Sequence, residues 1–186
     1  MRVISGTARG RRLHELQGMD TRPTTDKVKE ALFNIIQFDV PGSRVLDLFS
    51  GTGQLGIEAL SRGAERCVFV DKRREAVSLI RENVRSVGLA DQAQIIQGDA
   101  LDYLKRCREQ FGLIFLDPPY QTNLLESALT SILEFDILGN HGIIVCESSQ
   151  ERELPVLPPP YEMGREYRYG KIKLAVFRRP GSEPRL

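Results

Sequence analysis

The fold of this chain is decided by one stretch, Val45-Leu46-Asp47-Leu48-Phe49-Ser50-Gly51-Thr52-Gly53-Gln54-Leu55-Gly56. An apolar run typical of a buried strand ends in an acid, passes through small residues and enters a pattern typical of a helix. Gly51, Gly53 and Gly56 have the spacing G-x-G-x-x-G, which lets the backbone approach a bound cofactor closely. A strand, a glycine turn and a helix in this order predict a Rossmann-like sheet with its ligand at the carboxyl ends of the strands.

Two later strand-like runs also end beside an acidic residue. The first is Cys67-Val68-Phe69-Val70-Asp71. Asp71 follows the glycine loop at the separation along the sequence that is typical of an acid that accepts hydrogen bonds from ribose hydroxyls. The alternative is that Asp71 caps the helix expected to begin just after it; we predict the ribose role. Asp99, in Gly98-Asp99-Ala100, either meets an adenine amino group or caps the next helix, and these two roles are compatible.

The glycine loop fits both NAD and S-adenosylmethionine, and charge favours the second. A pyrophosphate is anionic and binds at a bare helix N-terminus. S-adenosylmethionine has no phosphate and carries an ammonium and a sulfonium. Asp47, directly before the loop, attracts these cations and would repel a pyrophosphate. We therefore predict an S-adenosylmethionine site made by Asp47, Phe49, Ser50, Gly51, Gly53, Asp71, Asp99 and Ala100.

The tetrad Asp117-Pro118-Pro119-Tyr120 follows the apolar run 112–116. Two prolines cannot donate backbone hydrogen bonds, so the strand ends there and presents carbonyls, a carboxylate and a ring at the sheet edge. Such a set suits the exocyclic amino group of a nucleobase, because the oxygens accept its hydrogens and the ring stacks on the base. The simpler interpretation is a strand-ending turn. The position downstream of the glycine loop favours chemistry.

The chain resembles the RsmD-type methyltransferases, which modify the N2 of a guanine in small-subunit (16S) ribosomal RNA. The resemblance covers nearly the whole chain, and two N-terminal pieces make it specific: Gly6-Thr7-Ala8-Arg9-Gly10-Arg11-Arg12-Leu13 and Arg22-Pro23-Thr24-Thr25-Asp26-Lys27-Val28-Lys29-Glu30-Ala31-Leu32-Phe33-Asn34. It implies a class I methyltransferase that uses S-adenosylmethionine. It also implies catalytic roles for Asp117, Pro118, Pro119 and Tyr120, and a role for the segment around Arg22 in closing the pocket.

Two other functions remain open from the residues alone. Guanine presents only donors at N1 and N2, which suits the acceptor-only carboxylate of Asp117. Adenine-N6 DNA methyltransferases also use this tetrad, but this chain has no extra stretch for a DNA-reading domain. A non-catalytic RNA-binding protein would need basic segments but neither an intact donor loop nor the tetrad.

Charge is distributed unevenly along the chain, although the net charge is only +1. Residues 1–29 and 161–186 each contain seven Lys or Arg against three Asp or Glu, whereas residues 30–160 contain twelve against nineteen. Basic segments contribute salt-dependent affinity for phosphates that does not depend on sequence. We therefore expect ribosomal RNA, free or in an assembled particle, to contact Arg9, Arg11, Arg12 and Arg22.

The whole pattern predicts one α/β methyltransferase domain, residues 1–186, with a mostly parallel, doubly wound sheet. A basic β-hairpin extension (1–22) precedes the Rossmann-like core (23–186), which ends in an antiparallel hairpin at 161–178. Strands are expected near 44–48, 67–71, 94–97, 113–117 and 142–147, and a helix at 26–37. The three cysteines and two histidines have no metal-ligand spacing, so we expect no metal. No signal or membrane-spanning segment is visible, and we expect a cytoplasmic protein.

Overall fold

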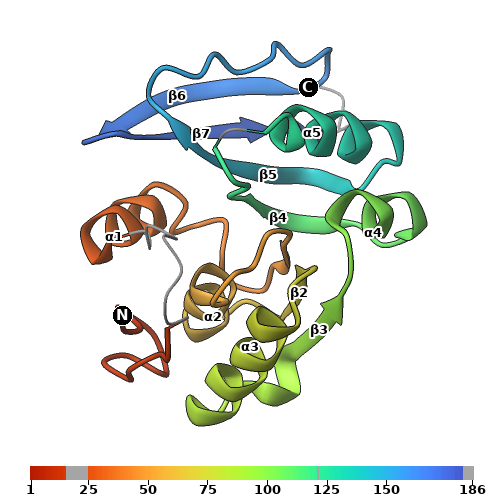
Figure 1. Cartoon of the computed structure of the whole chain (residues 1–186). Helices are drawn as coiled ribbons and strands as arrows, with labels where there is room; N and C mark the ends of the chain where they lie inside the picture. Colours follow the sequence, from red (N-terminus) through yellow and green to blue (C-terminus); the bar gives the residue numbers. More distant parts are fainter. Residues whose placement is uncertain (16–24, 121, 182–186) are drawn as a thin grey trace.

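The computed structural model describes residues 1–15, 25–120 and 122–181, which contain one seven-stranded sheet in the order β3-β2-β1-β4-β5-β7-β6 (Figure 1). Five strands run parallel: β1 (Arg44–Asp47), β2 (Arg66–Asp71), β3 (Ala93–Gln97), β4 (Phe111–Leu116) and β5 (Leu138–Ser149). The antiparallel hairpin of β6 (Glu162–Tyr169) and β7 (Ile172–Arg178) extends the sheet beyond β5. The predicted mixed sheet, with its C-terminal hairpin, is confirmed.

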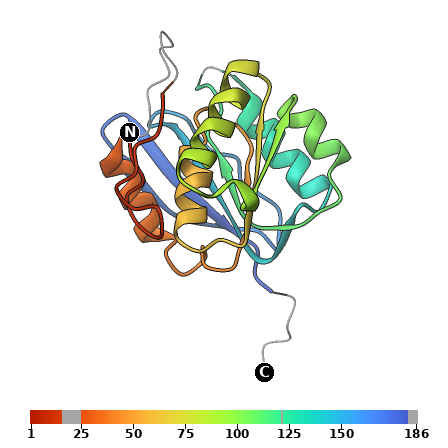
Figure 2. The same cartoon turned by 90° about the horizontal axis from the view of Figure 1, so that it is seen from below.

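Helices cover both faces of the sheet, as a doubly wound fold requires (Figure 2). One face carries α1 (Asp26–Ile35), α2 (Gln54–Ser61) and α3 (Arg74–Ser86), and the other carries α4 (Ala100–Arg106) and α5 (Leu124–Glu134). A short 3₁₀ turn, η1 (Ala90–Gln92), leads into β3. Since β1 and β4 are covered on both sides, their apolar residues are almost fully buried, which explains their uninterrupted apolar sequences.

The direction of strand addition reverses beside β1. From β1 the chain moves outward to β2 and β3, and then returns to β4 on the other side of β1. In open α/β sheets, a reversal of this kind leaves a crevice at the carboxyl ends of the two central strands. Asp47 and the Asp117 tetrad follow these two strand ends, so the topology brings the two predicted motifs to one edge.

The N-terminal segment differs from the expected β-hairpin. In residues 1–15 an antiparallel bridge joins Arg2 to Arg12 and backbone hydrogen bonds cross the same turn, from Val3 to Arg11, Gly10 to Val3 and Leu13 to Met1, but the pairing is too short to form strands. The physical reason is that the backbone N–H groups of Ile4 and Ser5 donate to the side chain of Glu58 on α2, at 2.8 and 3.0 Å, and not to a second strand. The expected boundary between residues 22 and 23 lies outside the described residues.

Two element boundaries also differ from the expectation. The first helix begins where predicted, with Thr25 as its cap, but ends at Ile35. β5 begins at Leu138 and not near 142, because Leu138 already pairs with Phe111 of β4; the ladder is then irregular through residues 139–142, where His141 is left-handed (φ 59°), and pairing resumes at Ile143. Within the described ranges, no helix is long and apolar enough to cross a membrane. Cys67, Cys107 and Cys146 are buried free thiols.

Candidate active site

The glycine loop joins β1 to α2 in a conformation that requires its glycines. Gly51 and Gly53 have φ values of +56° and +79°, in the left-handed region. A Cβ added to Gly56 would lie 2.3 Å from the ring of Phe69, so this glycine lets α2 pack closely on β2. A Cβ on Gly51 would meet only the Arg73 guanidinium, at 3.9 Å, so this side of the loop has room for a ligand.

Asp47 ends β1 underneath this loop and is 3% exposed. One carboxylate oxygen accepts a hydrogen bond from the Gly56 N–H at 3.0 Å, in the first turn of α2. Burial, with a smaller contribution from Asp71, raises the pKa of Asp47 to about 7 from its ordinary 3.8, and the Gly56 hydrogen bond only partly offsets this rise. A positively charged ligand would stabilise the ionised carboxylate, and so the predicted role beside a methionine ammonium fits the local electrostatics.

The other predicted loop residues have different surroundings. The Ser50 hydroxyl donates to the Asp47 carbonyl at 2.5 Å and accepts from the Val70 N–H at 2.9 Å, so it fastens the loop to β2. This hydroxyl is therefore committed to the backbone, and the main chain of Ser50 is bonded as well, since its N–H donates to Val70 and its carbonyl accepts from Gly53. Phe49 is partly buried against the hydrophobic core below α4 and α5.

Asp71 ends β2 and supports the loop through the Gly51 N–H, which donates to its carboxylate at 2.9 Å. Its second oxygen accepts from the Arg73 N–H at 2.9 Å and from the Arg73 side chain at 3.2 Å. Asp71 does not cap α3, whose N-terminal cap is Arg73. The ribose role remains a prediction, and in this structure the Arg73 guanidinium lies on the oxygens that a ribose would use.

Asp99 does cap a helix. One of its oxygens accepts from the N–H groups of Leu101 and Asp102, at 2.9 and 3.1 Å, at the start of α4. The residue is exposed at the carboxyl end of β3, beside the buried Ala100. The predicted contact of Asp99 with an adenine amino group is compatible with this cap and stays a prediction.

The tetrad follows β4 as the sequence predicted. Asp117 is half-buried, Pro118 is buried and Pro119 is exposed. The Tyr120 hydroxyl donates to the Glu147 carboxylate at 2.8 Å. Within the described part of the chain, the Asp117 carboxylate accepts no hydrogen bond, so its oxygens are available to a ligand.

Three carboxylates therefore lie together at this edge, from the ends of β1 and β4 and from β5. Removal from water, and then the charges of Glu147 and Asp47, raise the pKa of Asp117 well above its ordinary value. Glu147, 3% exposed, is the third member. Acids with raised pKa values, such as Asp47 and Asp117, are typical of a site that binds a cation or moves a proton. The described residues contain no group of three or more side chains arranged to hold a metal ion.

Arg152 also contacts the tetrad, although no sequence pattern points to it. Its guanidinium donates to the carbonyl oxygens of Tyr120 and Thr122, at 3.0 and 2.6 Å. It lies about thirty positions away, in a loop after β5, and no local motif surrounds it. A contact of this kind depends on the topology of the sheet, which periodicity cannot predict.

Three of the predicted RNA-binding arginines lie on the N-terminal segment. Arg9, Arg11 and Arg12 are exposed, and Arg11 donates to the Ser86 carbonyl at the end of α3, at 2.9 Å. Arg22 lies outside the described residues. The structure therefore presents three of the four side chains to solvent, and their contact with RNA remains a prediction.

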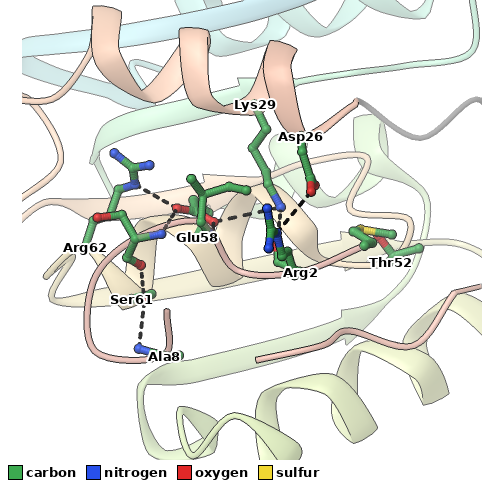
Figure 3. A network of polar contacts seen from close by, with 11 residues as sticks. Arg2, Ala8, Asp26, Lys29, Thr52, Glu58, Ser61 and Arg62 are labelled. Atoms are coloured by element: carbon green, nitrogen blue, oxygen red, sulfur yellow. Dashed lines mark hydrogen bonds and ion pairs between the residues drawn. The ribbon is translucent and has the colours of Figure 1, made fainter. Parts of the chain in front are cut away.

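A buried polar network fixes the segment that carries these arginines (Figure 3). Glu58, with a fully buried side chain, accepts from Ile4, Ser5 and the Arg62 guanidinium, and the Lys29 ammonium lies 3.8 Å from it. The Ser61 hydroxyl accepts from the Ala8 N–H at 2.9 Å. A Cβ on Gly6 would lie 1.7 Å from the Ser61 carbonyl oxygen, so the N-terminal motif is matched to α2. The network therefore holds the backbone that carries the three arginines in place.

The sheet order and the glycine loop define the class of protein: a Rossmann-like methyltransferase. A solved structure, the putative methyltransferase yhhF from Escherichia coli, superposes with a TM-score of 0.88 at 31% identity, over 98% of this chain and 99% of that one. This agreement extends to the N-terminal segment and the C-terminal hairpin, because it covers nearly all of both chains.

Sequence comparison then identifies the family. A family model described as conserved hypothetical protein 95 matches residues 1–178. The putative rRNA methyltransferase YlbH of Bacillus subtilis is 44% identical, over 97% of this chain and all of the relative. Ribosomal RNA small subunit methyltransferase D of Escherichia coli is 31% identical, over 96% of this chain and 90% of the relative. This chain belongs to that family, the RsmD-type methyltransferases.

Proposed function

We propose that this enzyme methylates the exocyclic N2 of a guanine in small-subunit ribosomal RNA, with S-adenosylmethionine as the methyl donor. The family supports the reaction class and the RNA, since its relatives are named for ribosomal RNA and one is named for the small subunit. The observation that carries the chemistry is the Asp117 carboxylate, which accepts no hydrogen bond from the described residues at the crevice of the sheet.

The residues around the glycine loop fit the methyl donor. Gly51 leaves room beside the loop, and the buried Asp47, with a pKa of about 7, gains from a cation. Asp71 and Asp99, at the neighbouring strand ends, would accept from the ribose and the adenine. When bound, S-adenosylmethionine supplies an electrophilic methyl group.

Asp117 would hold the guanine edge. Its carboxylate accepts from N2–H and N1–H, and the Pro118 carbonyl accepts the second amino hydrogen, which directs the nitrogen lone pair toward the methyl group. A raised pKa makes a carboxylate a better proton acceptor, so Asp117 can also take the proton that leaves N2 as the new N–C bond forms. Glu147 fixes the Tyr120 hydroxyl, and the Tyr120 ring would stack on a base turned out of its helix or loop.

The substrate in this proposal is a structured RNA, either free or in a ribosomal particle. The catalytic edge is rich in acids, so phosphate contacts must come from elsewhere. Arg9, Arg11 and Arg12 supply them from a fixed N-terminal segment, and Arg22 from the segment that follows. A ribosomal RNA substrate implies that the enzyme acts in the cytoplasm.

The test is methyl transfer to ribosomal RNA and to small-subunit particles, with the modified nucleoside identified by mass. We expect N2-methylguanosine from the wild-type enzyme. Asp117→Ala should lower turnover by about 10²–10³, as expected when one preorganised electrostatic partner is removed, while calorimetry shows S-adenosylmethionine still bound. Asp102→Ala, which removes an exposed carboxylate on α4, is the matched control and should stay active.

Two results would contradict the proposal in different ways. N6-methyladenosine as the product would keep the chemistry but overturn the guanine assignment. A fully active Asp117→Ala enzyme would mean that the tetrad is a structural turn.

A further inference from the structure

One arginine holds the backbone at the last residue of the tetrad and at Thr122. Arg152, in the loop after β5, donates to the carbonyl oxygens of Tyr120 and Thr122, which flank residue 121 on both sides. The Thr122 hydroxyl in turn donates to the Pro119 carbonyl at 2.8 Å. The backbone carbonyls of Pro119, Tyr120 and Thr122 are therefore each held by a side chain, and these three residues lie outside any helix or strand.

Tyr120 itself is fixed at both ends. Its hydroxyl donates to Glu147 at 2.8 Å, and its carbonyl accepts from Arg152 at 3.0 Å. Glu147 lies in β5, and Arg152 follows five residues later, so a single short segment holds the two ends of the residue. With the ring between two fixed points, the plane available for stacking is set before a base arrives.

Arg152 is in turn fixed by two neighbours. Its guanidinium makes two parallel contacts with Glu126 on α5, Nε to Oε1 at 3.1 Å and Nη2 to Oε2 at 2.5 Å. Its carbonyl accepts from the ammonium of Lys173, a 4% exposed residue on β7 that pairs with Glu166 on β6 at 3.4 Å. A connected set of contacts therefore leads from the C-terminal hairpin to the tetrad.

We propose that Arg152 is a positioning residue for the reaction, which acts through Tyr120 and sets the ring that stacks on the target base. The inference rests on the proposed function. It assigns the C-terminal hairpin a role beyond extending the sheet, since Lys173 of β7 anchors the loop that carries Arg152. Lysine cannot replace Arg152, because three groups are held at once by the planar fork of a guanidinium, and an ammonium has a different geometry.

The first experiment compares Arg152→Lys with Arg178→Lys. Arg178, at the end of β7, is a suitable control because it also makes two parallel contacts with a carboxylate, Asp39, at 2.9 and 3.2 Å, but none with the tetrad. We expect Arg152→Lys to lower kcat/KM for RNA by roughly tenfold or more, as small displacements of reacting groups do, with unchanged affinity for S-adenosylmethionine. The control should keep its activity. Equal activity of the two variants would overturn the proposal.

A double-mutant cycle separates positioning from a general structural role. If Arg152 acts through Tyr120, then Tyr120→Ala already removes the benefit, and Arg152→Lys added to it should cause no further loss. Independent, multiplying losses would show that Arg152 only stabilises the loop, which would overturn the inference.

The same four proteins are also compared for their affinity for RNA, which requires no methyl transfer. Losses of affinity that do not add would again support positioning through Tyr120, and additive losses would contradict it. This comparison also keeps the two proposals apart. A product other than N2-methylguanosine would refute the proposed function, whereas the coupling between Arg152 and Tyr120 would still decide the positioning role.

Discussion

Two carboxylate sites of this protein have opposite surroundings. Glu58, under the N-terminal segment, accepts from two backbone N–H groups and from Arg62, and it faces the Lys29 ammonium at 3.8 Å. At the sheet edge, Asp47 accepts one hydrogen bond from Gly56, and Asp117 accepts none from the described residues. Glu58 and Asp47 are buried and Asp117 is half-buried, and at the sheet edge removal from water raises the pKa values of Asp47 and Asp117.

The number of hydrogen-bond donors around each carboxylate indicates the function of its site. A buried carboxylate with enough donors holds segments together, and Glu58 joins the N-terminal segment to α1 and α2 (Figure 3). A carboxylate that lacks donors costs stability, and it is retained where a ligand brings the missing donors or the missing charge. The amino group of a base and the cationic end of a methyl donor supply what Asp117 and Asp47 lack.

The largest expected effect is on the stability of the donor-rich site. Glu58→Ala removes the acceptor of Arg62 and of two backbone N–H groups, and it removes the opposite charge beside the buried Lys29 ammonium; breaking a buried charged network in this way costs about 3–5 kcal/mol. Chemical denaturation measures the loss. The exposed Glu134→Ala on α5 is the control and should change the free energy of unfolding little. A loss below about 1 kcal/mol for Glu58→Ala would remove the basis of the comparison.

The second expected effect is the pH dependence of stability caused by Asp47. Its pKa is about 7 in the folded protein and 3.8 ordinarily, so the folded protein keeps a proton that the unfolded chain has already released. Stability therefore falls as the pH rises through this window, by about 1.4 kcal/mol per unit for one group.

Asp47→Asn should remove this dependence. Between pH 4 and 7, the free energy of unfolding of the variant should rise relative to that of the wild type. Above pH 7 the difference between the two should stay constant. The same variant should bind S-adenosylmethionine more weakly. Parallel pH profiles of the two proteins would show that the Asp47 carboxyl has no unusual pKa.

A third effect concerns the cofactor. A hydrogen bond to a charged group contributes about 1.5–3 kcal/mol, so Asp71→Ala should weaken S-adenosylmethionine binding roughly tenfold or more in calorimetry. The exposed Asp91→Ala provides a charge-matched control. Unchanged affinity in Asp71→Ala, or binding of NAD in its place, would refute the cofactor site.

The smallest effect per residue is expected at the arginines. Changing Arg9, Arg11 and Arg12 together to Ala should weaken RNA binding and make its dependence on salt shallower, without changing the affinity for the methyl donor. The matched control changes three exposed cations near the end of α4: Lys105, Arg106 and Arg108. If both triple variants keep the wild-type salt slope, the N-terminal arginines are only a solvated surface.

The sequence predicts the fold because its signals are local. Apolar runs, the glycine loop and the proline pair identify the strands and the edge at which the site lies. The donor counts that distinguish Glu58 from Asp117 depend on residues distant in sequence, since Ile4 and Ser5 reach Glu58 from more than fifty positions away. The same distance explains why no local pattern identifies Arg152, and why the sequence predicts N-terminal strands where the Ile4 and Ser5 N–H groups bond to α2.

The most direct test of this account measures two variants in two assays. Asp117→Asn and Glu58→Gln each neutralise one carboxylate, and each is assayed for methyl transfer and for the free energy of unfolding. We predict that Asp117→Asn loses most of its turnover and keeps or gains stability, whereas Glu58→Gln loses stability and its folded fraction keeps its turnover. An Asp117→Asn enzyme that is active but destabilised would contradict the central claim that the carboxylates lacking donors are the functional ones.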